Sequence, residues 1–245
     1  GRRQQLRASG ADDAVSPTRD MATLIPTALR RLDYADALTM QLRLRDDCIA
    51  CDGARNYLML VEHPPVITVG RAGERADVLA SADRLGQLGV QVAEANRGGE
   101  VTYHGPGQLV AYPIISLRQR GRDLHRYLRD LEAWLIALCG SYGVPARVNP
   151  PNTGVWVQER KIVSIGIAVR RWVAYHGAAL NVATDLSHFE LIVPCGLRGV
   201  RMTSLERELG AAPLLADAAE RAATLFAEHF DMELRPAAQG AAQRV

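Results

Sequence analysis

The chain has 245 residues, of which 48% are hydrophobic, so it can bury a substantial core and is not disordered as a whole. Twenty-nine Lys and Arg residues nearly balance 27 Asp and Glu residues, and a net charge of +2 gives no reason to expect nucleic-acid binding. No uninterrupted apolar run approaches the roughly 18 residues of a membrane-spanning helix. Four cysteines in a chain of this length indicate a reducing, cytoplasmic compartment rather than a disulfide framework.

The two ends of the chain differ in composition from its middle. Residues 1–20 are polar and aperiodic and lack the apolar stretch of a signal peptide, so we expect a disordered leader there. The last ten residues, 236–245, predict a disordered tail in the same way. No internal repeat or linker divides the residues between them, and the sequence predicts a single domain over 21–235.

Hydrophobic spacing in the first half of the chain predicts one helix and several strands. Apolar residues at helical intervals predict the helix over 34–51. The predicted strands are 57–61, 66–69 and 109–115. A turn at His63-Pro64-Pro65 joins the first two strands, and a glycine-rich loop over 97–108 precedes the third.

The second half of the chain predicts two longer helices with strands between them. A helix over 123–139 is expected to stop at Gly140, and a further amphipathic helix covers 213–230. The predicted strands are 155–157, 162–169 and 178–182. Thr203 and Glu206 have the spacing of a capping box for a short helix.

The order of these elements indicates the fold class. Helices and strands do not alternate one for one, which argues against a doubly wound parallel sheet. A mixed, largely antiparallel sheet flanked by helices, of the α+β class, fits the order better.

The segment from Arg97 to Gln108 contains four glycines and one proline in twelve positions, which excludes a helix. A tight loop between strands is the ordinary interpretation of such a segment. Glycines also let a backbone approach a ligand closely, and polar residues, including Thr102, Tyr103 and His104, are interleaved with them. Ligand contact is therefore the stronger hypothesis, although the GxxxxGK[ST] pattern of a nucleotide-binding loop is absent.

Three further segments carry candidate residues. Lys161 opens an apolar strand, where a lone lysine is usually solvated. The segment 175–181 places short residues beside an apolar strand. Cys195 lies in a Pro/Gly turn, where a thiol can be exposed among backbone N–H groups, although an isolated cysteine is more often a buried small apolar residue.

The remaining cysteines and the arginine clusters have structural interpretations. Cys48 and Cys51 form a CxxC pair, but no second pair or nearby pair of histidines completes a zinc site, so we expect packing within a helix. Cys139 is expected in the core. Arginines cluster at 118, 120, 122, 126 and 129, with pairs at 170–171 and 198/201. They are either a solvated surface or a docking site for an acidic partner protein.

Four segments carry a family resemblance when they are taken together and in order. They are RGGEVTYHGPGQL at 97–109, KIVSIGI at 161–167, HGAALNV at 176–182 and PCGL at 194–197. Together they resemble the octanoyl-acyl-carrier-protein:protein octanoyltransferases of lipoate biosynthesis, over roughly Leu32 to Leu209. The resemblance implies an acyltransferase with the α+β fold of biotin- and lipoate-protein ligase catalytic domains.

The resemblance also implies site residues. A catalytic cysteine–lysine dyad falls on Cys195 and Lys161. Implied substrate contacts are Arg97, Gly98, Gly99, Glu100, Val101, Thr102, Tyr103, His104, Ser164, Ile165, Gly166, Gly177, Ala178 and Ala179. Ala178 departs from the family, in which a bulkier apolar residue is common at this position, and the change could widen the pocket there.

The implied partners are octanoyl-acyl carrier protein as donor and, as acceptors, lipoyl domains of 2-oxoacid dehydrogenase complexes and the glycine cleavage H protein. No cofactor and no metal ion is implied, and neither nucleic acid nor a membrane is an expected partner. Two alternatives stay open: an ATP-dependent lipoate or biotin ligase on the same fold, which would not need Cys195, and a non-catalytic module that binds acyl groups or carrier proteins.

Elementary chemistry supports a cysteine for acyl transfer. Exchange of one thioester for another is near thermoneutral, and the thiolate is the reactive form of the side chain. A neighbouring ammonium at Lys161 would stabilise that thiolate and could later take a proton. Burying an eight-carbon chain at ~0.8 kcal/mol per methylene contributes about 5 kcal/mol, which is enough to hold the chain.

Overall fold

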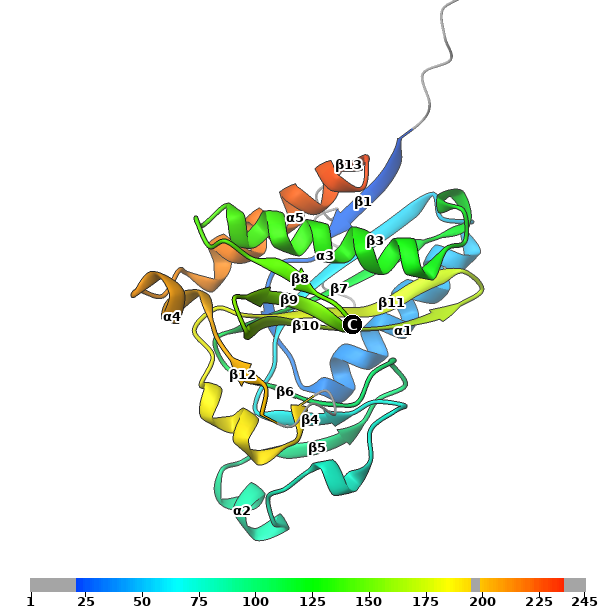
Figure 1. Cartoon of the computed structure of the whole chain (residues 1–245). Coiled ribbons are helices and arrows are strands. Elements are labelled where there is room, and N and C mark those ends of the chain that lie inside the picture. The colour runs from blue at the N-terminus through cyan, green and yellow to red at the C-terminus, as the bar shows by residue number, and fades with distance from the viewer. Residues whose placement is uncertain (1–20, 195–198, 236–245) are drawn as a thin grey trace, which may run out of the picture.

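The computed structural model describes residues 21–194 and 199–235, so the predicted leader and tail and the candidate Cys195 lie outside the described residues. Figure 1 shows a large sheet with helices on both faces and a second, small sheet below it. None of the helices in the described ranges is long and apolar enough to cross a membrane.

In chain order, the three strands of the small sheet lie between β3 and β7 of the large sheet. The helices are α1 (Tyr34–Ala50), α2 (Ala82–Gln87), α3 (Leu124–Gly140), α4 (Leu205–Leu209) and α5 (Leu215–His229). The strands are β1 (Ala22–Pro26), β2 (Arg30–Arg31), β3 (Arg55–Glu62), β4 (Val66–Val69), β5 (Gln91–Glu94), β6 (Val101–His104), β7 (Gln108–Ser116), β8 (Arg147–Asn149), β9 (Asn152–Val157), β10 (Arg160–Arg170), β11 (Val173–Asn181), β12 (Arg201–Met202) and β13 (Met232–Leu234).

The large sheet has the order β13-β1-β3-β7-β11-β10-β9-β8, with β2 paired to β3 and β12 paired to β10. Its centre, from β3 to β9, is antiparallel throughout. The parallel pairs involve β1, β2, β12 and β13, which are short strands at the periphery. The expected α+β class, with a mixed and largely antiparallel sheet, is confirmed.

The two faces of the large sheet bury different helices (Figure 1). Helices α3 and α5 cover one face, where the Trp134 and Phe226 rings meet edge to face with centroids 4.9 Å apart. The Trp134 indole also donates to the Ala222 carbonyl at 3.1 Å, so its polar atom is satisfied in the core. Helix α1 packs on the opposite face against Met59 and Ile114. The large sheet is therefore buried on both sides.

The small sheet, ordered β5-β4-β6, has one apolar and one polar face because side chains alternate along a strand. Val101 and Tyr103 of β6 belong to the apolar cluster that also contains Phe189. Thr102 and His104 project to the other face. That polar face is directed towards the large sheet and forms part of the cavity described below.

Helix α2 and several short strands had no prediction, and β11 begins at Val173, earlier than the predicted strand 178–182. Two further differences concern motifs that the sequence analysis named. Residues 101–104 form strand β6 inside the predicted glycine-rich loop, because they pair with β4. The capping box at Thr203 is wrong, since the residue that caps α4 is Ser204, whose hydroxyl accepts from the Arg207 amide at 3.2 Å. The Thr203 hydroxyl instead donates to Glu208.

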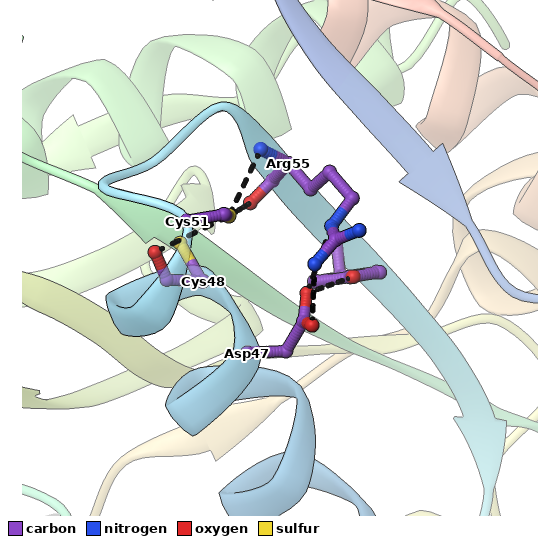
Figure 2. A network of polar contacts seen from close by, with 5 residues as sticks. Asp47, Cys48, Cys51 and Arg55 are labelled. Atoms are coloured by element: carbon purple, nitrogen blue, oxygen red, sulfur yellow. Dashed lines mark hydrogen bonds and ion pairs between the residues drawn. The ribbon is translucent and has the colours of Figure 1, made fainter.

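Cysteine packing agrees with a structural role for the CxxC pair, although Cys51 lies just beyond α1 (Figure 2). Cys48 is fully buried, and burial with the neighbouring Cys51 and Asp47 raises its pKa to about 12. The half-buried Cys51 accepts from the Arg55 amide at 3.4 Å and donates to the Cys48 carbonyl at 3.5 Å. Cys139 is fully buried in the core, as expected. A thiol with a raised pKa is a poor nucleophile near neutral pH.

Candidate active site

A cavity of about 410 Å³ lies between the polar face of the small sheet and strands β10 and β11. It is lined by Lys161 and by every predicted substrate contact except Tyr103. Three segments that are far apart in the sequence therefore meet at one site.

Tyr103 lies away from the cavity because of strand alternation. Its ring packs in the apolar cluster with His188 and Phe189, at centroid distances of 4.8 and 5.6 Å. Its neighbours Thr102 and His104 lie on the face that lines the cavity. In this strand, Thr102 and His104 therefore line the cavity, whereas Tyr103 packs in the apolar cluster.

The glycine-rich segment reaches the free edge of β10. Strand β9 pairs with β10 only as far as Val163. Further along, the Gly98 amide donates to the Ile167 carbonyl at 2.8 Å. A Cβ atom at Gly166 would lie 2.9 Å from the Gly98 carbonyl oxygen, so a side chain there would push the two segments apart. These glycines bring the segment into contact with β10.

Arg97 is fixed in the cavity wall by the small sheet. Its guanidinium donates to the Thr68 hydroxyl at 2.8 Å and to the Thr68 carbonyl at 3.0 Å. It also donates to the Gly98 carbonyl at 3.1 Å. A cation held in this way can attract a carbonyl or carboxylate oxygen of a ligand.

Three buried histidines, His63, His104 and His176, lie near Arg97 at one end of the cavity. Burial, the neighbouring His63 and Arg97 lower the pKa of His104 to about 3. Burial and Arg97 likewise lower the pKa of His176 to about 3, and burial lowers that of His63. All three imidazoles are therefore neutral near pH 7, and each ring has one donor and one acceptor nitrogen.

Hydrogen bonds determine which nitrogen of each ring carries the proton. His63 Nδ1 donates to the Leu32 carbonyl at 2.7 Å, so its Nε2 accepts from the Tyr112 hydroxyl at 2.8 Å. Similarly, His104 Nδ1 donates to the Gln108 side-chain oxygen at 2.8 Å. The neutral His104 ring is therefore a fixed part of the cavity wall, and the neutral His63 ring lies behind it, 5.7 Å away between centroids.

His176 has a backbone conformation that its neighbouring strand explains. Pro113 lies opposite in β7 and has no N–H to donate to β11. His176 takes a positive φ of 58° and donates its own N–H to the Gln41 side chain at 3.0 Å. At Gly177 a Cβ atom would lie 2.3 Å from the Ala111 carbonyl oxygen. The His-Gly pair is thus required by the path of the strand, and it places the His176 ring in the cavity lining.

Two residues of the cavity lining carry buried hydroxyl groups. Within the described residues, Tyr34 Oη and Thr102 Oγ1 are buried without a hydrogen-bond partner. Both residues line the cavity, and burial raises the pKa of Tyr34, so it remains a neutral donor. A bound oxygen atom would satisfy either hydroxyl.

Sequence reasoning missed several lining residues, among them Tyr34, Tyr112, Leu128 and His176. Tyr34 and Leu128 follow helical apolar patterns, and Tyr112 lies in an apolar strand, so the local signal for each is that of a core residue. Only His176 lies in a segment, 175–181, that the sequence analysis had singled out as a candidate for the site.

Lys161 is 2% exposed and lies in the cavity wall where β9 and β10 pair. Its Nζ lies 5.6 Å from the centroid of the Trp156 ring. The strand at this position is also held from the other side, since the Thr203 amide donates to the Lys161 carbonyl at 2.9 Å. The lysine that the sequence describes as ordinarily solvated is a buried cavity residue.

The predicted nucleophile Cys195 lies outside the described residues, but the chain on both sides of it is anchored. Before it, the Val193 amide donates to the Asp77 carbonyl at 2.8 Å. After it, Met202 of β12 pairs directly with Lys161 of β10. Among the described residues, no group of three or more His, Cys, Asp or Glu side chains could hold a metal ion.

Residues 33–227 match the family described as the lipoyl protein ligase A/B catalytic domain, and the chain belongs to this family. The fold agrees, because the chain superposes on a crystal structure of lipoate-protein ligase A bound with ATP with a TM-score of 0.69. That match has 19% sequence identity and covers 89% of this chain and 88% of the other. A putative lipoate protein ligase from T. acidophilum with bound lipoic acid gives a TM-score of 0.67 at 20% identity, covering 89% of each chain.

Curated relatives narrow the class within the family. The octanoyltransferase of Solibacter usitatus (strain Ellin6076) is 48% identical over 217 residues, covering 87% of this chain and 96% of that protein. The octanoyltransferase of Geotalea uraniireducens (strain Rf4) is 45% identical over 200 residues, covering 82% and 90%. These relatives identify the chain as an acyltransferase of the family.

Proposed function

We propose that this protein transfers an octanoyl group from octanoyl-acyl carrier protein to a lysine of a lipoyl domain, through a thioester on Cys195. The observation that carries the proposal is Lys161, a lysine that is 2% exposed in the wall of a cavity also lined by the glycine-rich segment. The names of the relatives support the octanoyl group. The cytoplasmic setting expected from the cysteine content suits a reactive thiol.

The cavity offers a suitable environment for an acyl chain. Ile165 and Ala178 pair directly across β10 and β11 in its wall, and Val110 and Leu128 add apolar surface. Polar groups of Arg97, His104 and His176 also line it. The pocket therefore combines an apolar contact surface with fixed hydrogen-bond donors, as binding sites for small molecules commonly do.

In the proposed first step, the Cys195 thiolate adds to the carbonyl carbon of the carrier thioester. The carrier thiolate leaves with a proton from the Lys161 ammonium, and an acyl-cysteine thioester forms. In the second step, the amine of the acceptor lysine adds to that carbonyl and gives a proton to Lys161. Cys195 then leaves as the thiolate, which restores the starting pair. Neither step consumes ATP.

The anchors around residues 195–198 support a nucleophile near Lys161. Val193 is held by Asp77, and Met202 is held against Lys161 itself. Cys48 and Cys139 are poor alternatives, because burial raises the pKa of each to about 12.

Acidic carrier domains would dock beside the cavity on exposed arginines of α3 and the turn before it. Arg118 pairs with Asp52, and Arg120 contacts the Phe230 carbonyl and ring, so both have structural partners. Arg122 and Arg129 have no ion pair within the described residues, and Arg129 follows Leu128 of the cavity wall. Reversing both charges (Arg122→Glu with Arg129→Glu) should raise KM for the carrier at low salt. No change in KM or in its salt dependence would exclude this docking surface.

The deciding experiment is intact-mass analysis after mixing with octanoyl-acyl carrier protein, followed by peptide mapping. The proposal requires an octanoyl adduct on the peptide containing Cys195, and its absence from Cys195→Ser. A label only at Cys48, Cys51 or Cys139 would overturn the assignment of the nucleophile. ATP-dependent ligation that survives Cys195→Ser would identify a ligase, and binding without adduct or turnover would identify a non-catalytic module.

A further inference from the structure

The side chain of Lys161, in β10, lies beside residues of the neighbouring strand β9. Lys161 pairs directly with Trp156 across the β9–β10 ladder, so both side chains project to the same face of the sheet. The ammonium nitrogen lies 5.6 Å from the Trp156 ring centroid. Trp156 is 3% exposed, so the ring and the lysine are both shielded from water. A cation over an aromatic ring is stabilised most strongly when both groups are desolvated.

Gly154, two residues before Trp156 on the same face, provides the space for the lysine stem. A Cβ atom built there would lie 2.6 Å from the Val163 carbonyl oxygen, 2.7 Å from Lys161 Cε and 3.3 Å from Lys161 Nζ. Its φ of 126° is also a conformation that residues with side chains rarely adopt. Its amide donates to the Glu132 carboxylate of α3 at 3.0 Å, which ties this part of β9 to the helix.

We propose that Trp156 and Gly154 are positioning residues that hold the Lys161 ammonium at its place in the cavity. This inference rests on the proposed function of Lys161 and extends it to residues that do not take part in the chemistry. The Trp156 ring presents its face to the ammonium, and the absence of a side chain at Gly154 leaves room for the lysine stem. Together they determine how much of the time the ammonium is available to the thiolate and to the leaving group.

The test is transfer kinetics of Trp156→Leu and Trp156→Phe. Loss of the aromatic face should lower kcat about tenfold, which corresponds to about 1.4 kcal/mol, with KM for the acyl donor little changed. The pH–rate profile of Trp156→Leu should also differ in shape from that of the wild type, which a purely structural loss would not cause. Trp156→Phe, which keeps a weaker aromatic face, should restore most of both quantities.

Val155→Ala is the matched control, since Val155 is on the same strand, faces the core of α3 and α5, and is fully buried. It should lower the melting temperature without moving kcat or the pH profile. The charged groups on the elements packed around Lys161, namely Glu132 of α3 and the Arg160–Glu208 pair, are unchanged in all of these variants.

The outcomes separate this inference from the function on which it rests. Full transfer by Lys161→Ala would remove the proposed role of the lysine itself. If Lys161→Ala is inactive but Trp156→Leu behaves like Val155→Ala, the positioning role is overturned and the function stands. Should Trp156→Leu fail to fold, Trp156→Phe must still lower kcat measurably at unchanged KM, and a wild-type kcat in Trp156→Phe would then overturn the inference.

Discussion

The two ends of the cavity bury ionisable side chains in opposite ways. At one end, Lys161 lies over the Trp156 ring, an arrangement that favours a cation. At the other end, burial and the charge of Arg97 lower the pKa of His104 and His176 to about 3, so those rings are neutral. The Lys161 ammonium thus faces an aromatic ring, whereas burial is the largest cause that keeps the two histidine rings neutral. Burial outweighs the hydrogen bond from His104 to the Gln108 side chain, which acts in the opposite direction.

This comparison assigns a different task to each end. In the proposed function, the lysine end exchanges a proton and its charge acts on a thiolate. The histidine end has fixed donors and acceptors that can orient a ligand without exchanging protons near neutral pH. Changes at the lysine end should therefore alter turnover, and changes at the histidine end should alter stability and binding.

The largest expected effect comes from removing the amine at the lysine end. Lys161→Ala should lose about 10²- to 10⁴-fold in transfer, the usual contribution of a positioned acid or base. Lys161→Arg should keep part of the Cys195 thiolate but lose most transfer, because arginine keeps its charge and cannot shuttle a proton. Octanoyl transfer to a lipoyl domain measures turnover, and the iodoacetamide rate against pH measures the thiolate. Near-wild-type transfer by Lys161→Ala would contradict the assignment.

Acid should unfold the protein through its histidine end. The pKa of His104 falls from its usual 6.5 to about 3 on folding, so the unfolded chain binds more protons between these values. Stability should be complete above about pH 6.5 and decline as pH falls towards 3, by up to about 1.4 kcal/mol per pH unit for each such histidine. Urea unfolding of His104→Gln between pH 7 and 4 should give a shallower decline. His125→Gln, an exposed histidine of α3, should leave the decline unchanged; equal slopes in both variants would refute the prediction.

Neighbouring residues of β6 should separate binding from packing. Tyr103→Leu removes ring contacts with His188 and Phe189 and should cost about 1–3 kcal/mol of stability, with KM unchanged. Thr102→Val removes a hydroxyl from the cavity lining and should raise KM a few-fold, with little change in stability. Thermal unfolding and steady-state kinetics on the same preparations give both numbers. A raised KM in Tyr103→Leu alone would mean that β6 presents the other face to the substrate.

The smallest effect is expected midway between the two ends. Ala178 pairs with Ile165 in the cavity wall, and Ile165 lies on β10 between Lys161 and Ile167, the residue that pairs with His176. Ala178→Leu should move the preferred acyl chain to a shorter length. Each methylene that no longer fits is worth ~0.8 kcal/mol, or about fourfold in kcat/KM. Competition between C6 and C8 carrier thioesters measures the ratio, and an unchanged ratio would show that the chain does not pass this residue.

Local patterns determined the longest elements of the fold. Helix α3 and strands β7 and β10 follow their apolar periodicity, and α3 ends at Gly140 as expected. The turn at His63-Pro64-Pro65 also separates β3 from β4 as expected. These signals are readable because helix and strand periods place apolar residues at fixed intervals within one segment.

The short strands needed information that no local segment contains. Strand β1 is a strand because it pairs in parallel with β3 and with β13, which lies about 200 residues further along the chain. Strand β6 forms inside a glycine-rich segment only through its ladder with β4. Pairing partners of this kind are set by tertiary packing, so their sequences show little periodicity of their own.

The sequence by itself determined which segments meet at the cavity, because glycines at 98, 166 and 177 are needed where two backbones approach closely. Tertiary structure alone decided which side chains complete the site. The local patterns of Tyr34, Tyr112 and Trp156 are those of core residues, yet the first two line the cavity and the third lies against the Lys161 ammonium. The physical reason is that an aromatic side chain satisfies the same local apolar pattern in a core and in a cavity wall, and only the elements packed opposite it decide which of the two it forms.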